Sequence, residues 1–179
     1  MDFNELALSR RSIRSFLQIP VSGDLVIKLL EAAQAAPSGG NCQPWHFYVI
    51  RDRTVIMKMY DRSIRQDFIT SAPVIIVVCA DILRSAGRYG DRGRDLYCIQ
   101  DTAAAVQNIL LCAASLDLGA CWCGAFDENA LSEILQLKND MRPVAVIPIG
   151  FFDIAPAMPK RRSLSEIATY IGSNGEDPK

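Results

Sequence analysis

Three arginines and a serine stand within five residues near the N-terminus, in the run Arg10-Arg11-Ser12-Ile13-Arg14. Their positive charges repel one another unless an anion lies between them, and each guanidinium presents several fixed donors that suit phosphate oxygens. The hydroxyl of Ser12 adds a further donor to the same patch. The run predicts a phosphate site, although a solvated basic surface is the simpler alternative.

A second polar stretch follows after one helix length of sequence, as Ala-Pro-Ser-Gly-Gly-Asn-Cys-Gln-Pro-Trp at 36–45. Gly39 and Gly40 give the backbone freedom to turn, and the amides of Asn41 and Gln43 each carry a donor and an acceptor. Such side chains can bind a ring with carbonyl and N–H groups, although a run of this kind is also typical of an ordinary loop. The two stretches in this order predict a site for a phosphorylated ring compound such as flavin mononucleotide (FMN).

Motifs of several other enzyme classes are absent from the sequence. The chain contains no Gly-x-Gly-x-x-Gly, no Gly-Lys-Ser/Thr loop, no His-Glu-x-x-His and no Gly-x-Ser-x-Gly. Its single histidine, His46, leaves little room for a catalytic triad. If the protein is an enzyme, the difficult chemistry therefore belongs to a cofactor.

The six cysteines do not form a recognisable metal or disulfide pattern. There is no Cys-x-x-Cys, and His46 stands far in sequence from most of the thiols. We therefore expect no metal site, and we interpret Cys79, Cys98 and Cys112 as small residues of the core.

Composition favours one domain, which we expect over 1–171, followed by a disordered tail at 172–179. Half of the 179 residues are apolar, an excess that suggests a partner chain covers part of the surface. The net charge of −1 creates no field that would draw the protein to nucleic acid or to anionic lipid. The best apolar run, 102–116, is too short to span a membrane, and the N-terminus lacks a signal core, so we expect a cytoplasmic protein.

Apolar periodicity predicts helices alternating with strands, after two N-terminal helices. Asp2 and Glu5 form a candidate capping box, Ser22 opens the second helix, and the run from Val74 to Cys79 is typical of a strand buried on both faces. We expect helices near 3–10, 22–36, 54–60, 97–118, 127–137 and 165–170, and strands near 46–50, 74–79, 120–123 and 144–150. This order predicts an α+β fold, with helices packed around a mixed sheet.

Two of these segments carry specific expectations. The helix at 97–118 is apolar nearly all round, so it must be buried on most sides, and Gly119 is expected to end it. The segment 84–95, with three glycines and four arginines, is expected to be a mobile loop. Those arginines could attract an anionic substrate or the phosphates of a pyridine nucleotide, although a solvated loop is the simpler interpretation.

Four motifs together resemble the FMN-dependent nitroreductase family. They are Arg-Arg-Ser-Ile-Arg at 10–14, Pro-Ser-x-x-Asn-x-Gln-Pro-Trp at 37–45, Leu-Gly-Ala-Cys-Trp-Cys-Gly at 118–124, and Lys-Arg-Arg at 160–162 followed by Leu164 and Glu166. The first two are fairly specific, the other two are weak alone, and the resemblance covers nearly the whole chain. It implies a mixed, mainly antiparallel sheet flanked by helices. It also implies an intertwined homodimer with an FMN in each of two interface sites.

The resemblance assigns the FMN phosphate to the N-terminal arginine run. Arg10, Ser12 and Arg14 would contact it, with Arg11 close by. Either Lys160 or Arg161 would return from the C-terminal end to the phosphate or to the ribityl chain, and the sequence does not decide between them.

The same resemblance assigns the flavin ring to two other segments. Pro37, Ser38 and Asn41 would come from the other subunit's loop, and Gln43 would lie near the ring edge or shape that loop. Cys123 and Gly124 would direct backbone N–H groups toward flavin N5 or O4, where negative charge develops on reduction. Trp122, which directly precedes Cys123, is expected to pack in the core.

The implied activity is hydride transfer from NAD(P)H to FMN and then to a small acceptor, such as a nitroaromatic or a quinone, by a ping-pong mechanism. No catalytic side chain is expected. A specialised flavin reaction on the same scaffold, such as reductive dehalogenation or activated-alkene reduction, is the nearest alternative. A non-catalytic FMN-binding module, or thiol or metal redox chemistry through the cysteines, are the others.

Overall fold

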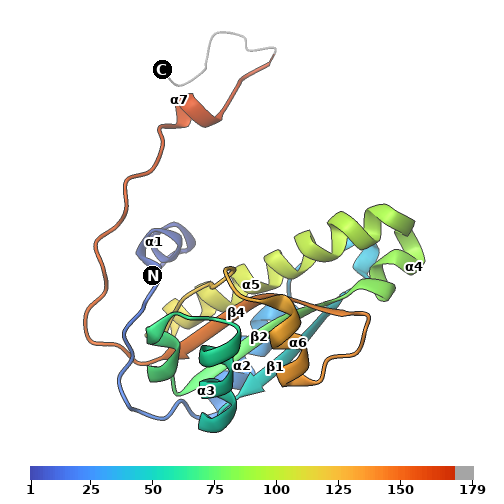
Figure 1. Cartoon of the computed structure of the whole chain (residues 1–179). Coiled ribbons are helices and arrows are strands. Elements are labelled where there is room, and N and C mark those ends of the chain that lie inside the picture. Colours follow the sequence, from blue (N-terminus) through green and yellow to red (C-terminus); the bar gives the residue numbers. More distant parts are fainter. Residues whose placement is uncertain (172–179) are drawn as a thin grey trace.

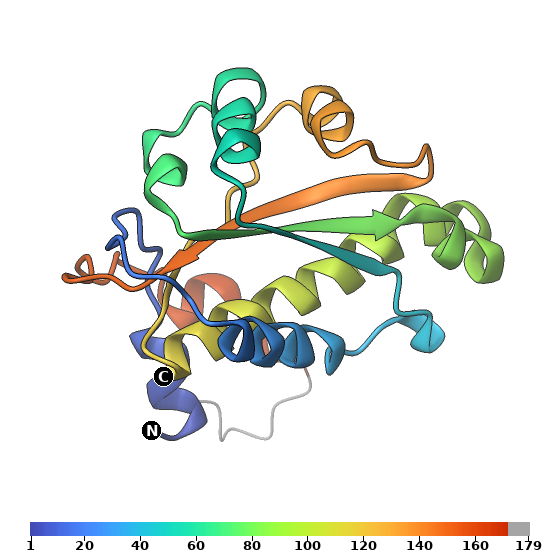
Figure 2. The ribbon, with the colours of Figure 1, turned by 90° about the horizontal axis from the view of Figure 1, so that it is seen from below.

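A computed structural model describes residues 1–171, whose centre is an antiparallel sheet of four strands (Figure 1). The strand order is β1 (Trp45–Ile50), β2 (Val74–Asp81), β4 (Met141–Gly150) and β3 (Gly119–Ala120). Helices cover both faces of this sheet (Figure 2). The α+β fold with a mainly antiparallel sheet is therefore confirmed, whereas the tail expected at 172–179 lies outside the described residues.

The central strand β2 separates two hydrophobic cores. Val74, Ile76 and Val78 belong to one cluster, and the alternate residues Ile75 and Val77 belong to the other. All are fully buried, as expected for a strand whose side chains point alternately to two covered faces.

Two pairs of helices form the layers above and below the sheet. One face is covered by α2 (Gly23–Gln34) and α5 (Cys98–Ser115), and the other by α3 (Arg53–Arg62) and α6 (Glu128–Leu135) (Figure 2). None of the helices within residues 1–171 has the length and apolar character needed to cross a membrane.

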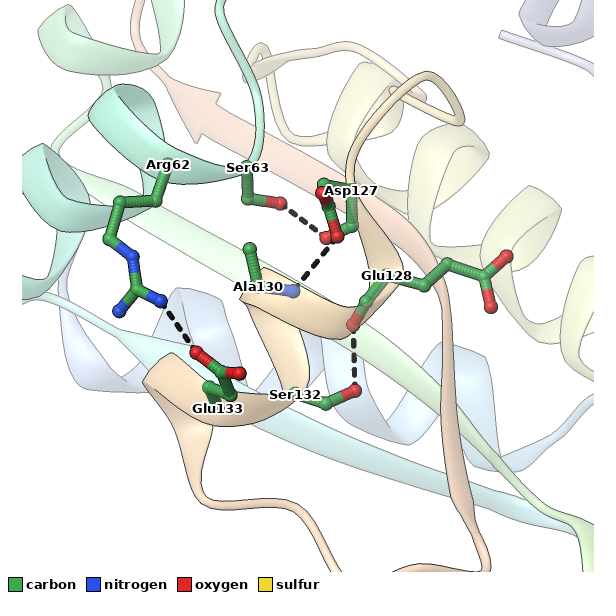
Figure 3. Close-up of polar contacts among 7 residues, drawn as sticks. All are labelled: Arg62, Ser63, Asp127, Glu128, Ala130, Ser132 and Glu133. Atoms are coloured by element: carbon green, nitrogen blue, oxygen red, sulfur yellow. Dashed lines mark hydrogen bonds and ion pairs between the residues drawn. The ribbon is translucent and has the colours of Figure 1, made fainter.

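Polar contacts join α3 to the beginning of α6 (Figure 3). Asp127 caps α6 by accepting the Ala130 N–H at 2.9 Å, and its own carbonyl accepts the Ser63 hydroxyl at 2.9 Å. Arg62 forms an ion pair with Glu133. Because that pair is exposed, it contributes little, and the cap and the buried core decide where α6 lies.

The segment expected to be a mobile loop is helical, so that prediction was wrong. Asp81 caps α4 (Ile82–Arg92), and a π-helical turn, η3 (Gly93–Tyr97), joins α4 directly to α5. Gly90 adopts a positive φ of 56° at a kink, and a Cβ on Gly93 would lie 2.4 Å from the Ser85 carbonyl oxygen. These glycines permit a bend and a close helix contact rather than a loop.

The end of α5 also differs from expectation. Asp117, with a φ of 56°, takes the left-handed position, and the Leu118 N–H donates to the Ala113 carbonyl at 2.9 Å. Gly119 therefore does not end the helix but lies two residues later, in β3.

The remaining elements lie at the ends of the chain and in its connections. They are α1 (Phe3–Ser9), with the expected capping box, the 3-10 turns η1 (Gly39–Asn41) and η2 (Asp67–Ser71), and α7 (Leu164–Ile167). After β4 the chain leaves the body as an arm, which we define as residues 153–171 (Figure 1). Every residue of the arm is exposed.

Candidate functional site

Two segments far apart in the sequence, 10–14 and 156–161, meet in one pocket of about 340 Å³. We call it the basic pocket, and it is lined by Arg10, Arg11, Ser12, Arg14, Pro156, Ala157, Pro159 and Arg161. Four of these eight residues are arginines, and none is acidic. Lys160, the other basic residue expected from the C-terminal motif, is not among them.

The edge strand β3 fixes the N-terminal side of the basic pocket. Ser12 pairs with Ala120 in a parallel bridge, and the Ile13 N–H donates to the Ala120 carbonyl at 3.0 Å. Ile13 is buried against Gly119, where an added Cβ would lie 2.7 Å from the Ile13 side chain. This close approach holds residues 12 and 13 against the sheet, so the neighbouring arginines are carried on a fixed backbone.

The charges of the basic pocket are not neutralised within the described part of the chain. The ion pairs in residues 1–171 are Arg62–Glu133 and Arg142–Glu128, and neither involves a pocket residue. Arg11 donates to the carbonyl of Arg10 at 3.0 Å, and Arg14 lies 6.0 Å from the ring centre of Phe68. Four arginines that line one hollow without a carboxylate partner among the described residues favour an anion.

The second predicted stretch forms a tight loop, which we call the amide loop and define as residues 38–43. Ser38 Oγ accepts the Gln43 N–H at 2.9 Å, and Gln43 Nε2 donates to Asn41 Oδ1 at 3.2 Å. Gly40, Asn41 and Gln43 have positive φ values of 51°, 55° and 50°. The loop thus brings the two amide side chains together, with Pro37 exposed immediately before it.

Within one chain, the amide loop and the segment 10–14, which lines the basic pocket, lie at opposite ends of the sheet (Figure 2). The loop leads into Trp45, which pairs with Ala80, whereas Ala120 beside the pocket pairs with Ile149, next to Val74. Val74 and Ala80 are six residues apart on one strand, about 20 Å at the usual rise. The structure therefore does not bring the two predicted halves of the site together in a single chain.

The third segment, 121–124, runs along β4 close to the basic pocket. The Cys123 N–H donates to the Val146 carbonyl at 2.9 Å, so it is already paired and the role expected for it is corrected. Gly124 is exposed, and its N–H has no partner among residues 1–171. The expectation that Trp122 packs in the core was wrong, because 41% of this residue is exposed.

The thiols near the pocket are buried. A hydrogen bond from the Cys123 thiol, together with the charge of Arg14, lowers the pKa of Cys121 below its usual value. The same contact, followed by burial, raises the pKa of Cys123. Farther away, on β2, burial raises the pKa of Cys79 to about 12. Among residues 1–171, no three His, Cys, Asp or Glu side chains are grouped to hold a metal ion.

Sequence reasoning missed the residues that hold the amide loop in place. Asp101 on α5 accepts the Gly39 N–H at 3.0 Å, and Arg88 on α4 donates to the Gly40 carbonyl at 2.9 Å. Arg84 donates to the carbonyl of Cys42. These contacts join residues far apart in the sequence, so the only sign of them in the sequence was Asp101, an acidic residue within an apolar helix.

Comparison with known proteins places this geometry in context. The sequence model of the nitroreductase family matches residues 7–66 and 58–151. A protein of Archaeoglobus fulgidus with the provisional name NADH dehydrogenase/NAD(P)H nitroreductase is 36% identical over 151 residues, which cover 82% of this chain and 83% of that one. The FMN reductase [NAD(P)H] of Bacillus subtilis is 29% identical over 153 residues, covering 78% of this chain and 61% of that protein.

Solved structures share the fold as well. The crystal structure of a nitroreductase family protein from Clostridium difficile is 31% identical, has a TM-score of 0.83, and is matched over 95% of this chain and 98% of that one. Since family motifs, sequence identity and fold agree over most of its length, the chain belongs to the nitroreductase family.

Proposed function

We propose that the protein is an FMN-dependent oxidoreductase that takes hydride from NAD(P)H and reduces a small acceptor such as a nitroaromatic or a quinone. The observation that carries this proposal is the basic pocket, with four arginines, a serine hydroxyl and no acidic group. The names of the relatives, NAD(P)H nitroreductase and FMN reductase, support the same cofactor and electron donor.

The donor set of the basic pocket suits the FMN phosphate. A phosphate monoester carries nearly two negative charges at neutral pH and accepts several charge-assisted hydrogen bonds. In the proposal, Arg10, Ser12 and Arg14 contact it, Arg11 lies close by, and Arg161 is the contact from the C-terminal segment. Arg161 is preferred to Lys160 because only Arg161 lines the pocket.

The flavin ring requires donors and acceptors that one chain does not bring to the basic pocket. The amide loop carries Ser38, Asn41 and Gln43, and Pro37 directly precedes it, but the loop lies about 20 Å away along the sheet, by the strand rise. We therefore propose a homodimer in which the loop of one subunit completes the pocket of the other. Each FMN would then lie at the subunit interface.

Exposed apolar residues support this dimer. In the arm, Leu164 and Ile171 are 71% and 94% exposed, and α7 is a single turn that cannot be stable in water alone. Helix α1 has no buried residue, and Phe3 on it is 70% exposed. Apolar surfaces of this kind at both ends of a chain suit burial against a second subunit.

When bound, FMN supplies the redox chemistry, because its ring accepts a hydride from NAD(P)H and returns two electrons to an acceptor. The protein binds and orients the cofactor through the basic pocket and the amide loop. The unpaired Gly124 N–H is suited to donate to a ring atom that gains negative charge. We propose no protein acid or base, and we expect ping-pong kinetics because both substrates use one site in turn.

The absorption spectrum of the purified protein tests the proposal. Flavin bands that bleach when NADH or NADPH is added without oxygen would support the oxidoreductase, and a panel of nitroaromatic, quinone, halogenated and activated-alkene acceptors would then identify the reaction. Bands that persist would indicate a non-catalytic FMN-binding protein. Folded protein that is colourless and does not bind added FMN would overturn the proposal.

A further inference from the structure

The amide loop is held in place by groups from two helices that are not part of the proposed cofactor contacts. Asp101 on α5 accepts the Gly39 N–H at 3.0 Å. Arg88 and Arg84 on α4 donate to the carbonyls of Gly40 and Cys42. Three backbone groups of the loop are therefore hydrogen-bonded to side chains that lie more than 40 residues away in the sequence.

Asp101 is an unusual residue for a helix that packs in the core. It is only 7% exposed, and its Oδ2 has no hydrogen-bond partner among residues 1–171. Burial raises its pKa, because water solvates the ionised form poorly at this position. Burying a carboxylate with so few partners lowers stability. Its one hydrogen bond goes to the amide loop, so this loop is where the residue acts.

The loop needs such support because its backbone is strained. Asn41 and Gln43 adopt positive φ values, which side-chain-bearing residues rarely do. Gly40 is pressed against α4, where an added Cβ would lie 2.4 Å from the Tyr89 hydroxyl and 2.7 Å from Arg88 Cζ. Without contacts from outside, the backbone would relax to commoner conformations and the two amide side chains would lose the hydrogen bond that joins them.

We infer that Asp101 and Arg88 are positioning residues that hold the amide loop in the conformation that binds the flavin ring. The inference rests on the proposed function, since it assigns these residues to the ring side of that site. Neither residue contacts the reacting atoms. Asp101 acts through the Gly39 N–H, and Arg88 acts through the Gly40 carbonyl.

Four variants of the full-length protein test the inference. Asp101→Leu removes the acceptor, whereas Asp101→Asn retains an oxygen that can accept the Gly39 N–H. Arg88→Met removes the donor to the loop. Arg92→Met is the matched control on the same helix, because Arg92 donates to the Tyr97 hydroxyl and not to the loop.

We expect Asp101→Leu and Arg88→Met to raise the Kd of FMN about tenfold, the ratio that corresponds to about 1.4 kcal/mol. They should also shift the bound flavin spectrum and slow flavin reduction by NADH. Asp101→Asn should restore most of the affinity, and Arg92→Met should match the wild type. Inhibition of FMN binding by inorganic phosphate should be unchanged in all four, because the basic pocket is untouched.

The outcomes separate this inference from the proposed function. If the wild type binds FMN and both Arg88→Met and Asp101→Leu bind it with wild-type affinity and spectrum, the positioning role is overturned and the enzyme assignment stands. If Asp101→Leu does not fold, Arg88→Met decides, because Arg88 is exposed. A wild type that binds no FMN would overturn both.

Discussion

Arg10, Arg14 and Arg161 line a pocket without a carboxylate. Like charges held this close raise the energy of the empty pocket, and a bound anion lowers it. A ligand that binds only the folded protein also raises its melting temperature. At the scale of single residues, loss of a proposed phosphate contact should therefore lower both the affinity for FMN and the melting temperature of the FMN-bound protein.

Replacing Arg14 by alanine should weaken FMN retention, and Ser12→Ala should weaken it less. Loss of one charge-assisted hydrogen bond costs roughly 1.5–3 kcal/mol, or roughly a 10- to 150-fold rise in Kd. Titration of apoprotein with FMN, followed by flavin fluorescence, measures this rise. Unchanged affinity in Arg14→Ala would mean that the phosphate lies elsewhere.

Lys160 and Arg161, adjacent basic residues of the arm, should differ in how much they contribute to FMN affinity. Arg161→Ala should raise the Kd of FMN by an amount similar to that for Arg14→Ala, because Arg161 lines the basic pocket. Lys160→Ala is the matched control and should leave the Kd within about twofold, since removal of one solvated surface charge has little effect. The reverse order in an FMN titration would contradict the assignment of Arg161.

At the scale of elements, the two-residue strand β3 connects the basic pocket to the core. It pairs with β4 on one side, and residues 12 and 13 lie on its other side. The pocket therefore depends on how closely the N-terminal segment approaches Gly119. That approach is a packing contact, but we expect a change in it to alter cofactor binding.

Gly119→Ala should lower both the thermal stability and the FMN affinity. The new Cβ would lie 2.7 Å from the buried Ile13 side chain, so the segment that carries Ser12 must shift, and overpacking of this kind costs about 1–3 kcal/mol. Gly23→Ala is the matched control, because no atom lies within 4 Å of its added Cβ and Gly23 lies outside the proposed cofactor site. Thermal melts with and without FMN compare the two, and an unshifted melt for Gly119→Ala would exclude the proposed crowding.

The sequence predicted the elements whose pattern is local. The buried strand around Val74–Cys79 and the capped helix after Asp127 are present as expected. Helix α4 was missed because Gly87, Gly90 and Gly93 suggest a loop. The kink at Gly90 and the contact of Gly93 with Ser85 explain two of these glycines, and neither can be recognised without the structure.

For the candidate site, the types of residue were predictable but several relationships were not. Nothing local in the sequence separates Lys160 from Arg161 or shows that the Cys123 N–H is paired with Val146. The burial of Asp101 against Gly39 depends on how α5 packs against the loop. Each of these is a long-range contact, and such contacts leave no periodic signal in the sequence.

At the scale of the whole molecule, the body and the arm have different roles. Within residues 1–171, every buried apolar side chain lies between Ile13 and Ile149 in the sequence. The arm contributes none of them, although Arg161 within it lines the basic pocket. The body should therefore fold without the arm, whereas the dimer and the cofactor site should not form without it.

Ending the chain after Phe152 should give a folded monomer that does not retain FMN. Sedimentation velocity measures the loss of the dimer, and circular dichroism measures the retained fold. A chain that ends at Ile171 is the control and should remain dimeric and yellow. A shortened monomer that still binds FMN tightly would contradict a site shared between subunits.

The union of the two chain ends in one pocket also has a consequence for biosynthesis. Arg14 is synthesised before nearly all of the core and Arg161 after it, because the buried apolar residues run from Ile13 to Ile149. Domains generally fold as units during translation, so the body can fold before the basic pocket is complete. If the protein binds FMN as proposed, newly made protein is apoprotein, and the flavin supply after translation sets how many molecules become active.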